Sequence, residues 1–486
     1  MTSLAAIGAY VPRPRLTRAA ILEGQGKSAR GARGERAVCG WDEDSLTMAV
    51  EVARGCVAAT PGRIGGVTLA STSLPFEDRQ NATIVATALN LDADIRTQDV
   101  GGTQRAGTSA LIDAIAAADA CAGDRLVIAS DARESRSGSV QEMRFGDGAA
   151  AVTVSRGEGI AEVLATQSRS VDFVDHYRGQ GQRFDYYWEE RWVRDEGYLK
   201  LVPEAVAAAL EAAGVAPGEV DHAVLPQAVP KAAQGICKAV GLPPAALADG
   251  LQDSVGETGT AHPLLMLAAV LERAAPGQVI VVVGFGQGCD VIVLRTTGRL
   301  AGIGPRDWFS GPLARRAEER SYYRYMARNT LVERDEGMRA EVDYQSAMTQ
   351  IYRRRDMLLA LVGGRCPDCG TPQFPRSRVC VNPGCGSFAT QEPFDFADKI
   401  ARVVSWSADH LTYTPEPPAR YGLIQFEGGG RMFANFTDMD GADVDVGSAM
   451  RMVFRIKEFD RKRGFRRYFW KATPCVSRQA NDNGDA

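Results

Sequence analysis

One α/β unit occurs twice in the first 300 residues, and this repeat constrains the fold more than any other feature of the sequence. Each copy consists of an Ala- or Leu-rich helical stretch, a Gly-containing turn, a buried strand, a second Gly-rich turn and another strand. The first copy covers residues 109–150 and the second covers residues 264–294. Alternating strands and helices predict a layered α/β fold. A unit used twice suggests two similar halves that share a site where they meet.

The composition is that of an ordinary globular protein and excludes some classes of function. At about 150 residues per domain, 486 residues predict about three domains. The chain is 45% hydrophobic and 24% charged, which excludes a fibre or a disordered protein. The net charge of -4 provides no long-range field that would attract nucleic acid or an anionic membrane. We therefore expect neither of these partners.

Two further absences in the sequence bear on location. The longest apolar strand, 279–283, is far shorter than the roughly 18 to 20 residues that span a bilayer. The first residues lack the basic start and the long apolar run of a signal peptide. We expect a cytoplasmic protein with reduced thiols.

The chain changes character after residue 304. Residues 305–363 are rich in Arg, Glu and Tyr and carry few strand signals, so we expect a solvated linker of surface helices. Short β-rich runs with Gly-bearing turns return at residue 401, which is typical of a small barrel. We predict two halves over 1–165 and 166–304, a helical linker over 305–363, a cysteine-bearing module over 364–392, a barrel over 393–478 and a disordered tail over 479–486.

Four of the ten cysteines form the strongest single motif in the chain. Cys366 and Cys369 lie on one Gly-bearing knuckle, and Cys380 and Cys385 lie on another. Four thiolates on two such knuckles can occupy the corners of a tetrahedron around Zn²⁺. Because such a site leaves no open coordination position, we predict a structural zinc ion whose binding energy becomes folding energy. Two disulfides or unrelated core thiols are the alternative.

Several motifs occur in an order that resembles a known family. They are Gly8–Leu16, Gly40–Val50, Gly107–Leu111, Gly146–Ala151 and Gly284–Gly288. Over residues 1–300 the chain resembles the hydroxymethylglutaryl-CoA synthase branch of the thiolase superfamily, particularly its prokaryotic members. The remainder resembles the zinc-ribbon and OB-fold protein that partners thiolase-like enzymes. The resemblance implies a five-layer αβαβα fold followed by a rubredoxin-like zinc ribbon and a small OB-fold barrel. It also implies dimerisation and a coenzyme A thioester as substrate.

The chain departs from this family at the four positions that would carry its chemistry. The resemblance implies a Cys nucleophile, a Glu acid/base, a His and an Asn. Their places are taken by Gln104, by Thr72, by the segment 226–231 that contains Gln227, and by Glu257. An amide cannot be acylated as a thiolate can. We therefore do not expect covalent acyl-enzyme condensation.

Our leading hypothesis is a non-covalent C–C lyase or aldolase that acts on a β-hydroxyacyl-CoA. Retro-aldol cleavage needs a base for the hydroxyl and donors for the thioester enolate, but no nucleophile. The resemblance extends to thiolase-like steroid side-chain aldolases, which lack the usual cysteine and pair with a zinc-ribbon and OB-fold partner. Glu257 is our first candidate for the base, His262 and Tyr198 are candidates for proton transfer, and Gln104 is a candidate amide donor. The alternatives are a salt bridge for Glu257 and core packing for His262 and Tyr198.

Other functions stay open at this point. One is a hydroxymethylglutaryl-CoA synthase-like acyltransferase, and another is a thioester decarboxylase in which glutamine imitates an acylated cysteine. A third is a non-catalytic CoA-binding scaffold for a partner thiolase or acyl-CoA enzyme. We expect a homodimer.

Three further segments each allow two interpretations. The aromatic stretch 184–192 could wall a pocket for a bulky acyl group or form a subunit contact. Cys289 could be a displaced active thiol or a small core residue. The basic run 455–468 could be a solvated loop or could hold the CoA phosphates.

Overall fold

The computed structural model describes residues 2–118, 122–439 and 444–475, which belong to two compact units, Met1–Arg334 and Asp335–Ala486. The predicted disordered tail at 479–486 and Cys121 lie outside the described residues.

The first unit is built on two groups of strands. In sheet order, the first group is β1 (Thr2–Tyr10), β7 (Gly148–Arg156), β6 (Asp124–Asp131), β4 (Ile64–Ala70) and β5 (Arg96–Val100). The second group is β8 (Ala161–Ser170), β13 (Gly288–Thr296), β12 (Val279–Phe285) and β11 (His222–Val224). Among the described residues, the two groups join only where β1 meets β8, at Ser3–Glu162 and Leu4–Ala161. The unit therefore has two halves, each with its own sheet.

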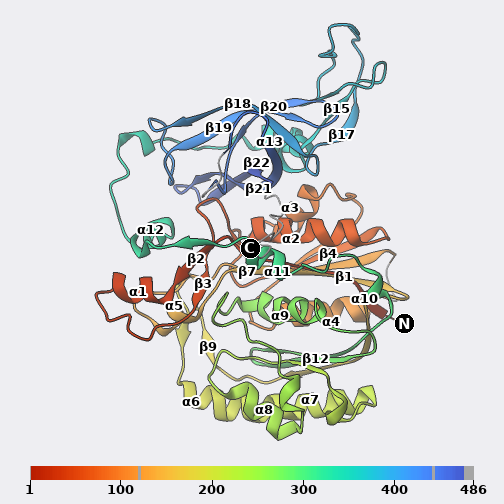
Figure 1. Cartoon of the computed structure of the whole chain (residues 1–486), viewed down its shortest axis with the longest axis vertical. Helices are drawn as coiled ribbons and strands as arrows, with labels where there is room; N and C mark the ends of the chain where they lie inside the picture. The colour runs from red at the N-terminus through yellow and green to blue at the C-terminus, as the bar shows by residue number, and fades with distance from the viewer. Residues whose placement is uncertain (1, 119–121, 440–443, 476–486) are drawn as a thin grey trace, which may run out of the picture. The chain divides into compact units, whose positions relative to one another are not determined.

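Helices complete five layers around these sheets (Figure 1). The outer face of the first sheet is covered by α2 (Ser45–Ala59) and α3 (Asn81–Ala88), and that of the second by α7 (Leu199–Ala213) and α8 (Ala232–Val240). Between the sheets lie α4 (Ala106–Ala117) and α9 (His262–Leu271). A helix enclosed by two sheets is apolar on all sides, and α9 is buried at every position except Pro263. The predicted αβαβα architecture is confirmed.

The internal repeat corresponds to the central helices and the strands that follow them. In the first half α4 leads to the antiparallel pair β6–β7, and in the second half α9 leads to the antiparallel pair β12–β13. Strand β12 is buried at all of its positions because helices cover both of its faces. This double burial explains the unbroken apolar run at 279–283.

Residues 305–334 differ from the solvated linker that the sequence predicted. Strand β14 (Ala317–Glu319) extends a small sheet by pairing with β2 (Pro14–Thr17), which also pairs with β3 (Glu35–Ala37). Helix α12 (Tyr322–Arg328) buries Tyr322 and Tyr325 against Leu16 and Ile21. The two tyrosines are three positions apart and so share one helix face. The many charged residues of this segment suggested a solvated linker, but its tyrosines pack into a buried cluster.

The remaining short elements of the first unit surround this framework. They are α1 (Arg18–Gly24), α5 (Val140–Arg144), β9 (His176–Tyr177), β10 (Tyr186–Tyr187), α6 (Glu190–Trp192), a π-helical turn (Val193–Tyr198), α10 (Arg299–Gly302), α11 (Ser310–Ala314) and three 3-10 turns (Pro217–Glu219, Pro244–Ala246 and Gly259–Ala261).

The second unit contains two β modules. After α13 (Met348–Arg353) and α14 (Arg355–Leu359), a three-stranded sheet forms from β15 (Val362–Arg365), β16 (Pro372–Gln373) and β17 (Glu392–Asp395). Five strands then pair in the order β20 (Arg431–Asn435), β19 (Ala419–Phe426), β18 (Ala401–Asp409), β21 (Ala449–Asp460) and β22 (Phe465–Pro474). A bridge between Phe436 and Ala472 brings the two edges of this sheet together. The predicted small barrel is thus present.

The basic run 455–468 is not the loop that we expected. Most of it forms the paired ends of β21 and β22, and residues 461–464 make the turn between them. Arg455 is 1% exposed and donates to Asp438 across 3.0 Å. The basic residues of this run suggested a solvated loop, but the aromatic and β-branched residues between them continue the strands.

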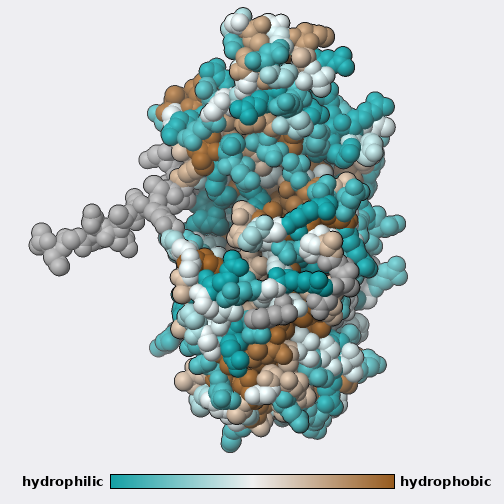
Figure 2. Space-filling model, turned by 90° about the vertical axis from the view of Figure 1, so that its right-hand side faces the viewer, coloured by the Kyte–Doolittle hydropathy of each residue, from teal (hydrophilic) through white to brown (hydrophobic). Residues whose placement is uncertain are grey.

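Within the described residues no helix is long and apolar enough to cross a bilayer. On the face shown in Figure 2, apolar residues occur as separate patches among hydrophilic ones.

Candidate functional site

A single pocket in the first unit gathers most of the side chains predicted to be functional. Its empty volume is about 840 Å³, counted to its open mouth. It lies beside the N-terminal ends of the two central helices, α4 and α9, one from each half of the unit. Five of the six predicted residues line it, namely Gln104, Tyr198, Gln227, Glu257 and His262.

Gln104 lies in the turn before α4, close to the turn that joins β12 to β13. Thr103 Oγ1 donates to the carbonyl of Gly286 across 2.9 Å. A Cβ atom at position 286 would lie 3.1 Å from the backbone nitrogen of Gln104, so glycine permits this close approach. The Gly284–Gly288 motif therefore brings the second half of the unit against Gln104.

The Gln104 amide touches groups from two other segments. Its Nε2 lies 3.4 Å from Thr72 Oγ1 and 3.4 Å from His176 Nε2. Its Oε1 is buried and has no hydrogen-bond partner among the described residues. Thr72 does not line the pocket itself and acts on it only through Gln104.

Asp131, at the end of β6, fixes the loop that carries Thr72. Its carboxylate accepts hydrogen bonds from the backbone of Thr72 at 2.8 Å and from the hydroxyls of Ser71 and Ser73 at 2.9 and 2.8 Å. It also accepts from Thr260 N at 2.8 Å. One buried carboxylate therefore joins the loop after β4 to the turn before α9 and fixes the position of each relative to the other.

His176 and Asp175 form a pair that the sequence analysis missed. Both line the pocket, and His176 Nδ1 lies 3.1 Å from Asp175 Oδ2. A carboxylate only accepts, so the proton of a neutral ring lies on Nδ1 and the lone pair lies on Nε2. That Nε2 is the atom that faces the Gln104 amide. The only sequence signal was a histidine after an acidic residue in a chain with four histidines.

Glu257 is held in an ion pair. Its Oε2 accepts from Arg133 Nη1 across 2.7 Å, and its Oε1 accepts from the backbone of Gly259 across 3.0 Å. Arg133 also donates to Asp185 across 2.6 Å, and its guanidinium lies 3.8 Å from the ring centroid of Phe145. The alternative of a salt bridge therefore describes Glu257 better than that of a free base.

The electrostatics of this cluster keep Arg133 and Asp185 ionised. Burial alone would lower the pKa of Arg133, but Glu257 and Asp185 raise it above the ordinary value. Burial alone would likewise raise the pKa of Asp185, but the charge of Arg133 and its hydrogen bond lower it. Arg133 is thus a cation whose charge is matched by its own neighbours.

His262 has the contacts of a structural histidine. Its Nε2 lies 3.1 Å from the carbonyl of Gly250, and its Nδ1 lies 3.3 Å from the backbone nitrogen of Thr258. Burial lowers its pKa, so the ring is neutral at physiological pH. Both ring nitrogens are occupied by the backbone, which leaves neither for proton transfer to a ligand.

Tyr198 and Gln227 line the pocket in different ways. Tyr198 packs on Phe285 with ring centroids 4.3 Å apart, and burial raises its pKa well above the ordinary value. Tyr187 also lines the pocket, and burial raises its pKa to about 12. Both phenols therefore stay protonated. Gln227 Nε2 donates to the carbonyl of Ala248 across 2.8 Å, which fixes its amide.

The aromatic stretch 184–192 divides between the pocket and the surface. Tyr187 lines the pocket, whereas Tyr186, Trp188 and Trp192 are 54%, 52% and 46% exposed. Cys289 is fully buried in the core, where burial raises its pKa to about 12. It does not line the pocket and is not a displaced active thiol.

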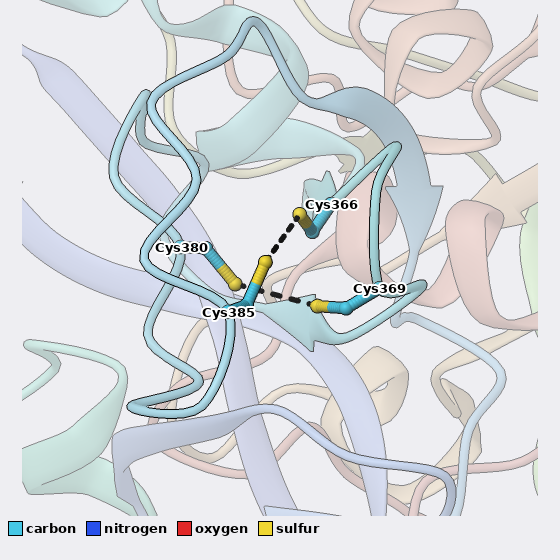
Figure 3. Close-up of side chains that lie close together, drawn as sticks. All are labelled: Cys366, Cys369, Cys380 and Cys385. Carbon is cyan, nitrogen blue, oxygen red and sulfur yellow. Dashed lines mark hydrogen bonds between the residues drawn. The ribbon is translucent and has the colours of Figure 1, made fainter.

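The second unit brings the four knuckle cysteines together (Figure 3). Cys366 Sγ lies 3.9 Å from Cys385 Sγ, and Cys369 Sγ lies 3.6 Å from Cys380 Sγ. All four sulfur atoms lie within 4.8 Å of one another. A tetrahedron with Zn–S bonds of about 2.3 Å has sulfur atoms about 3.8 Å apart. The four thiols therefore fit a zinc ion, and the chain offers it no open position.

Local backbone geometry shapes the knuckles. The carbonyl of Cys366 accepts from Gly370 N across 2.9 Å, which closes the first knuckle. Gly370 has φ 71° and Gly386 has φ 63°, a region that favours glycine. The glycine after each cysteine pair was the sequence signal for these turns.

Comparison with known proteins identifies the family. A protein of Methanocella arvoryzae described as hydroxymethylglutaryl-CoA synthase is 30% identical over 336 residues, which cover 66% of this chain and 96% of that relative. A hydroxymethylglutaryl-CoA synthase of Methanopyrus kandleri is 30% identical over 298 residues, which cover 58% of this chain and 83% of the relative. The chain belongs to the hydroxymethylglutaryl-CoA synthase family.

Family models and solved structures extend this assignment. Residues 210–294 match the model of the 3-oxoacyl-[acyl-carrier-protein] synthase III C terminal. Residues 359–391 match the rubredoxin-like zinc ribbon domain of ChsH2, and residues 396–455 match its C-terminal OB-fold domain. This member of the hydroxymethylglutaryl-CoA synthase family thus carries a zinc ribbon and an OB fold, as the resemblance predicted.

Two solved structures share the fold of this family member at low identity. The curacin biosynthetic pathway HMG synthase, in complex with acetyl donor-ACP, has a TM-score of 0.59 at 19% identity, over 67% of this chain and 88% of that chain. The 3-oxoacyl-[acyl-carrier-protein] synthase III of Aquifex aeolicus has a TM-score of 0.54 at 21% identity, over 61% of this chain and 100% of that chain. Both support the thiolase-like architecture of the first unit.

Proposed function

We propose that this chain is an acyl-CoA-dependent C–C bond enzyme that cleaves a β-hydroxyacyl-CoA by a retro-aldol reaction without a covalent intermediate. The observation that carries the proposal is the row Asp175–His176–Gln104. A histidine poised as a base faces an amide at the position where the family resemblance implies a nucleophilic cysteine. The row supplies a base and a donor, and it contains no nucleophile.

The reaction begins at the hydroxyl group of the substrate. His176 Nε2 takes the proton of the β-hydroxyl while Asp175 holds the ring through Nδ1. The Cα–Cβ bond breaks, the β-carbon becomes a ketone or aldehyde, and the electron pair passes to Cα and the thioester as an enolate. The imidazolium then returns the proton to Cα, which yields the shorter acyl-CoA. Atoms and electrons balance with no added oxidant or reductant.

Gln104 serves the thioester side of the reaction. Its Nε2 makes only long contacts, at 3.4 Å to Thr72 and to His176, and its Oε1 has no partner among the described residues. An amide held this loosely can turn to donate to the thioester oxygen as negative charge develops there. The protonated phenols of Tyr187 and Tyr198 line the same pocket and are further donors.

The proposed base is therefore His176 and not Glu257, which was the first candidate from the sequence. Glu257 shares its charge with Arg133 and accepts a backbone hydrogen bond, so both of its oxygens are engaged. We assign it a positioning role, in which it holds Arg133 and the turn at Gly259.

Two of the other functions considered from sequence have less support. Among the described residues no cysteine lines the pocket, so the acyltransferase reading lacks a nucleophile. The pocket is open and holds polar side chains within reach of one another, whereas a scaffold protein would not need to retain this arrangement. The identity of Gln104 is the one observation that favours decarboxylation of a malonyl thioester. The experiment below distinguishes this reaction by its release of CO₂.

The second unit completes the proposal. We infer that Cys366, Cys369, Cys380 and Cys385 hold one structural zinc ion, which supplies no step of the reaction. We also propose that the chain acts as a homodimer or with a partner thiolase.

Mass analysis of CoA products tests the function. The purified full-length chain is incubated with β-hydroxyacyl-CoAs and with malonyl-CoA. Formation of a ketone or aldehyde with a shorter acyl-CoA supports the lyase, and loss of this activity by about 10²-fold or more in His176→Ala supports the base. CO₂ release would establish the decarboxylase, and a covalent acyl adduct would restore the synthase. No turnover of any thioester would overturn the proposal.

A further inference from the structure

We propose that the pocket selects an uncharged, bulky acyl group and rejects acyl groups that end in a carboxylate. This inference rests on the proposed acyl-CoA function and names the substrate class for the same site. It follows from the ion pairs around the pocket and from the side chains that form its walls.

The cations at the pocket are already paired with carboxylates of the protein. The lining of the pocket contains two guanidinium groups, Arg133 and Arg144, and no lysine among the described residues. Arg133 donates to Glu257 and to Asp185, and Arg144 donates to Glu190 across 2.8 Å. Each cation that a substrate carboxylate could reach therefore already has a partner.

The acidic groups near the pocket balance the nearby cations, because Asp185 also pairs with Arg178 across 3.2 Å. Glu257 and Asp175 line the pocket, and Asp185 and Glu190 stand behind the two arginines. Arg133 and Asp185 have side chains only 4% and 5% exposed, so water screens this pair poorly. A carboxylate that entered would lie beside the carboxylates of Glu257 and Asp175 and would find both guanidinium groups already paired. Transfer of an unpaired anion to such a site is unfavourable.

The walls of the pocket favour an apolar acyl group. Phe145, Leu225, Met266, Val283 and Phe285 are each less than 9% exposed and line the cavity. The empty volume of about 840 Å³ includes the open mouth, so the apolar walls, and not the volume, indicate the kind of acyl group. These apolar side chains suit a branched or cyclic hydrocarbon better than a short acidic chain.

Affinity measurements on unreactive acyl-CoAs test the selection apart from catalysis. The probes are glutaryl-CoA, 5-methylhexanoyl-CoA, in which an isopropyl group replaces the carboxylate, and 3-phenylpropanoyl-CoA, which carries a ring. None has a β-hydroxyl, so binding does not depend on lyase activity. We expect the branched and ring-bearing probes to bind the full-length chain at least about tenfold more tightly than glutaryl-CoA.

A variant that frees a cation supplies the sharper test. Asp185→Asn removes one of the two carboxylates on Arg133, and we expect it to reduce the preference for 5-methylhexanoyl-CoA over glutaryl-CoA at least about threefold. Asp195→Asn is the matched control, because Asp195 is half-exposed, pairs with Arg194 on the surface and does not line the pocket. It should leave the preference unchanged.

The outcomes separate this inference from the proposed function. Equal or tighter binding of glutaryl-CoA by the unmodified chain would overturn charge selection while leaving the lyase proposal standing. An unchanged preference in Asp185→Asn would also overturn it. If no probe bound at all, this inference and the acyl-CoA function would both fall.

Discussion

The carboxylate of Asp175 holds its neighbour His176 at two points. Oδ1 accepts from the backbone N–H of His176 across 2.9 Å, and Oδ2 lies 3.1 Å from the ring Nδ1. The carbonyl of Asp175 in turn accepts from Trp188 N across 3.0 Å, which ties the pair to the opposite strand of the β9–β10 ribbon. One residue thereby sets the tautomer and the orientation of the proposed base.

The first prediction concerns this pair. Asp175→Asn keeps the shape of the side chain but presents an amide that can donate, so the imidazole loses the acceptor that fixes its proton on Nδ1. We expect kcat for lyase turnover to fall by about 10²-fold or more with little change in KM. Asp172→Asn, at an exposed position three residues away, should leave kcat unchanged. Equal kcat values in the two variants would remove His176 as the base.

The sequence predicted the framework of the site better than its chemistry. The motifs around Gly107 and Gly284 fix backbone approaches, because a Cβ at either position would overlap its neighbours. Such constraints are local in sequence and can be read from it. His176 arrives on a two-residue strand with no motif. Only the fold reveals that this ribbon turns one side chain toward Gln104.

The partners of Glu257 and His262 could not be predicted from the segments that carry these two residues. Glu257 and His262 line the same pocket as Gln104, since both occur in the turn and helix start at the beginning of α9. Their partners, Arg133 and the carbonyl of Gly250, come from distant segments. The residue type shows which chemistry a side chain could perform. The hydrogen-bond and ion-pair partners of that side chain decide whether it is available for that chemistry.

The second prediction separates Glu257 from His176. Glu257→Gln leaves Arg133 with Asp185 as its only carboxylate partner, so we expect a loss of unfolding free energy of about 1–3 kcal/mol. We expect kcat to change by less than about tenfold, because the carboxylate does not touch the reacting atoms. Urea unfolding and steady-state kinetics on the same preparation measure both. A fall in kcat of about 10²-fold at unchanged stability would make Glu257 the base instead.

The third prediction concerns the four thiols. Metal analysis of the full-length chain should find about one zinc ion per chain. Cys380→Ser should lose it and should render the second unit sensitive to proteolysis, because the binding energy of the metal is part of the folding energy. Cys475→Ser is the control, since Cys475 lies outside the cluster. A Cys380→Ser protein that kept a full complement of zinc would contradict the assignment.

The fourth prediction concerns pH and His262. Burial lowers the pKa of His262 in the folded state. At pH values between the folded and unfolded pKa, the unfolded chain binds a proton at this histidine and the native chain does not. This contribution to stability is fully present above the ordinary histidine pKa of about 6.5 and is lost as the pH falls below it. His262→Gln retains an amide that can donate to the carbonyl of Gly250 but cannot titrate. Its unfolding free energy should therefore depend less on pH between pH 7 and pH 5, by at most the slope of one proton. Urea unfolding across this range measures the difference, and His410→Gln, at an exposed position, should retain the dependence of the unmodified chain. An identical slope in His262→Gln would show that His262 does not resist protonation in the fold, and its assignment as a neutral structural histidine would then be wrong.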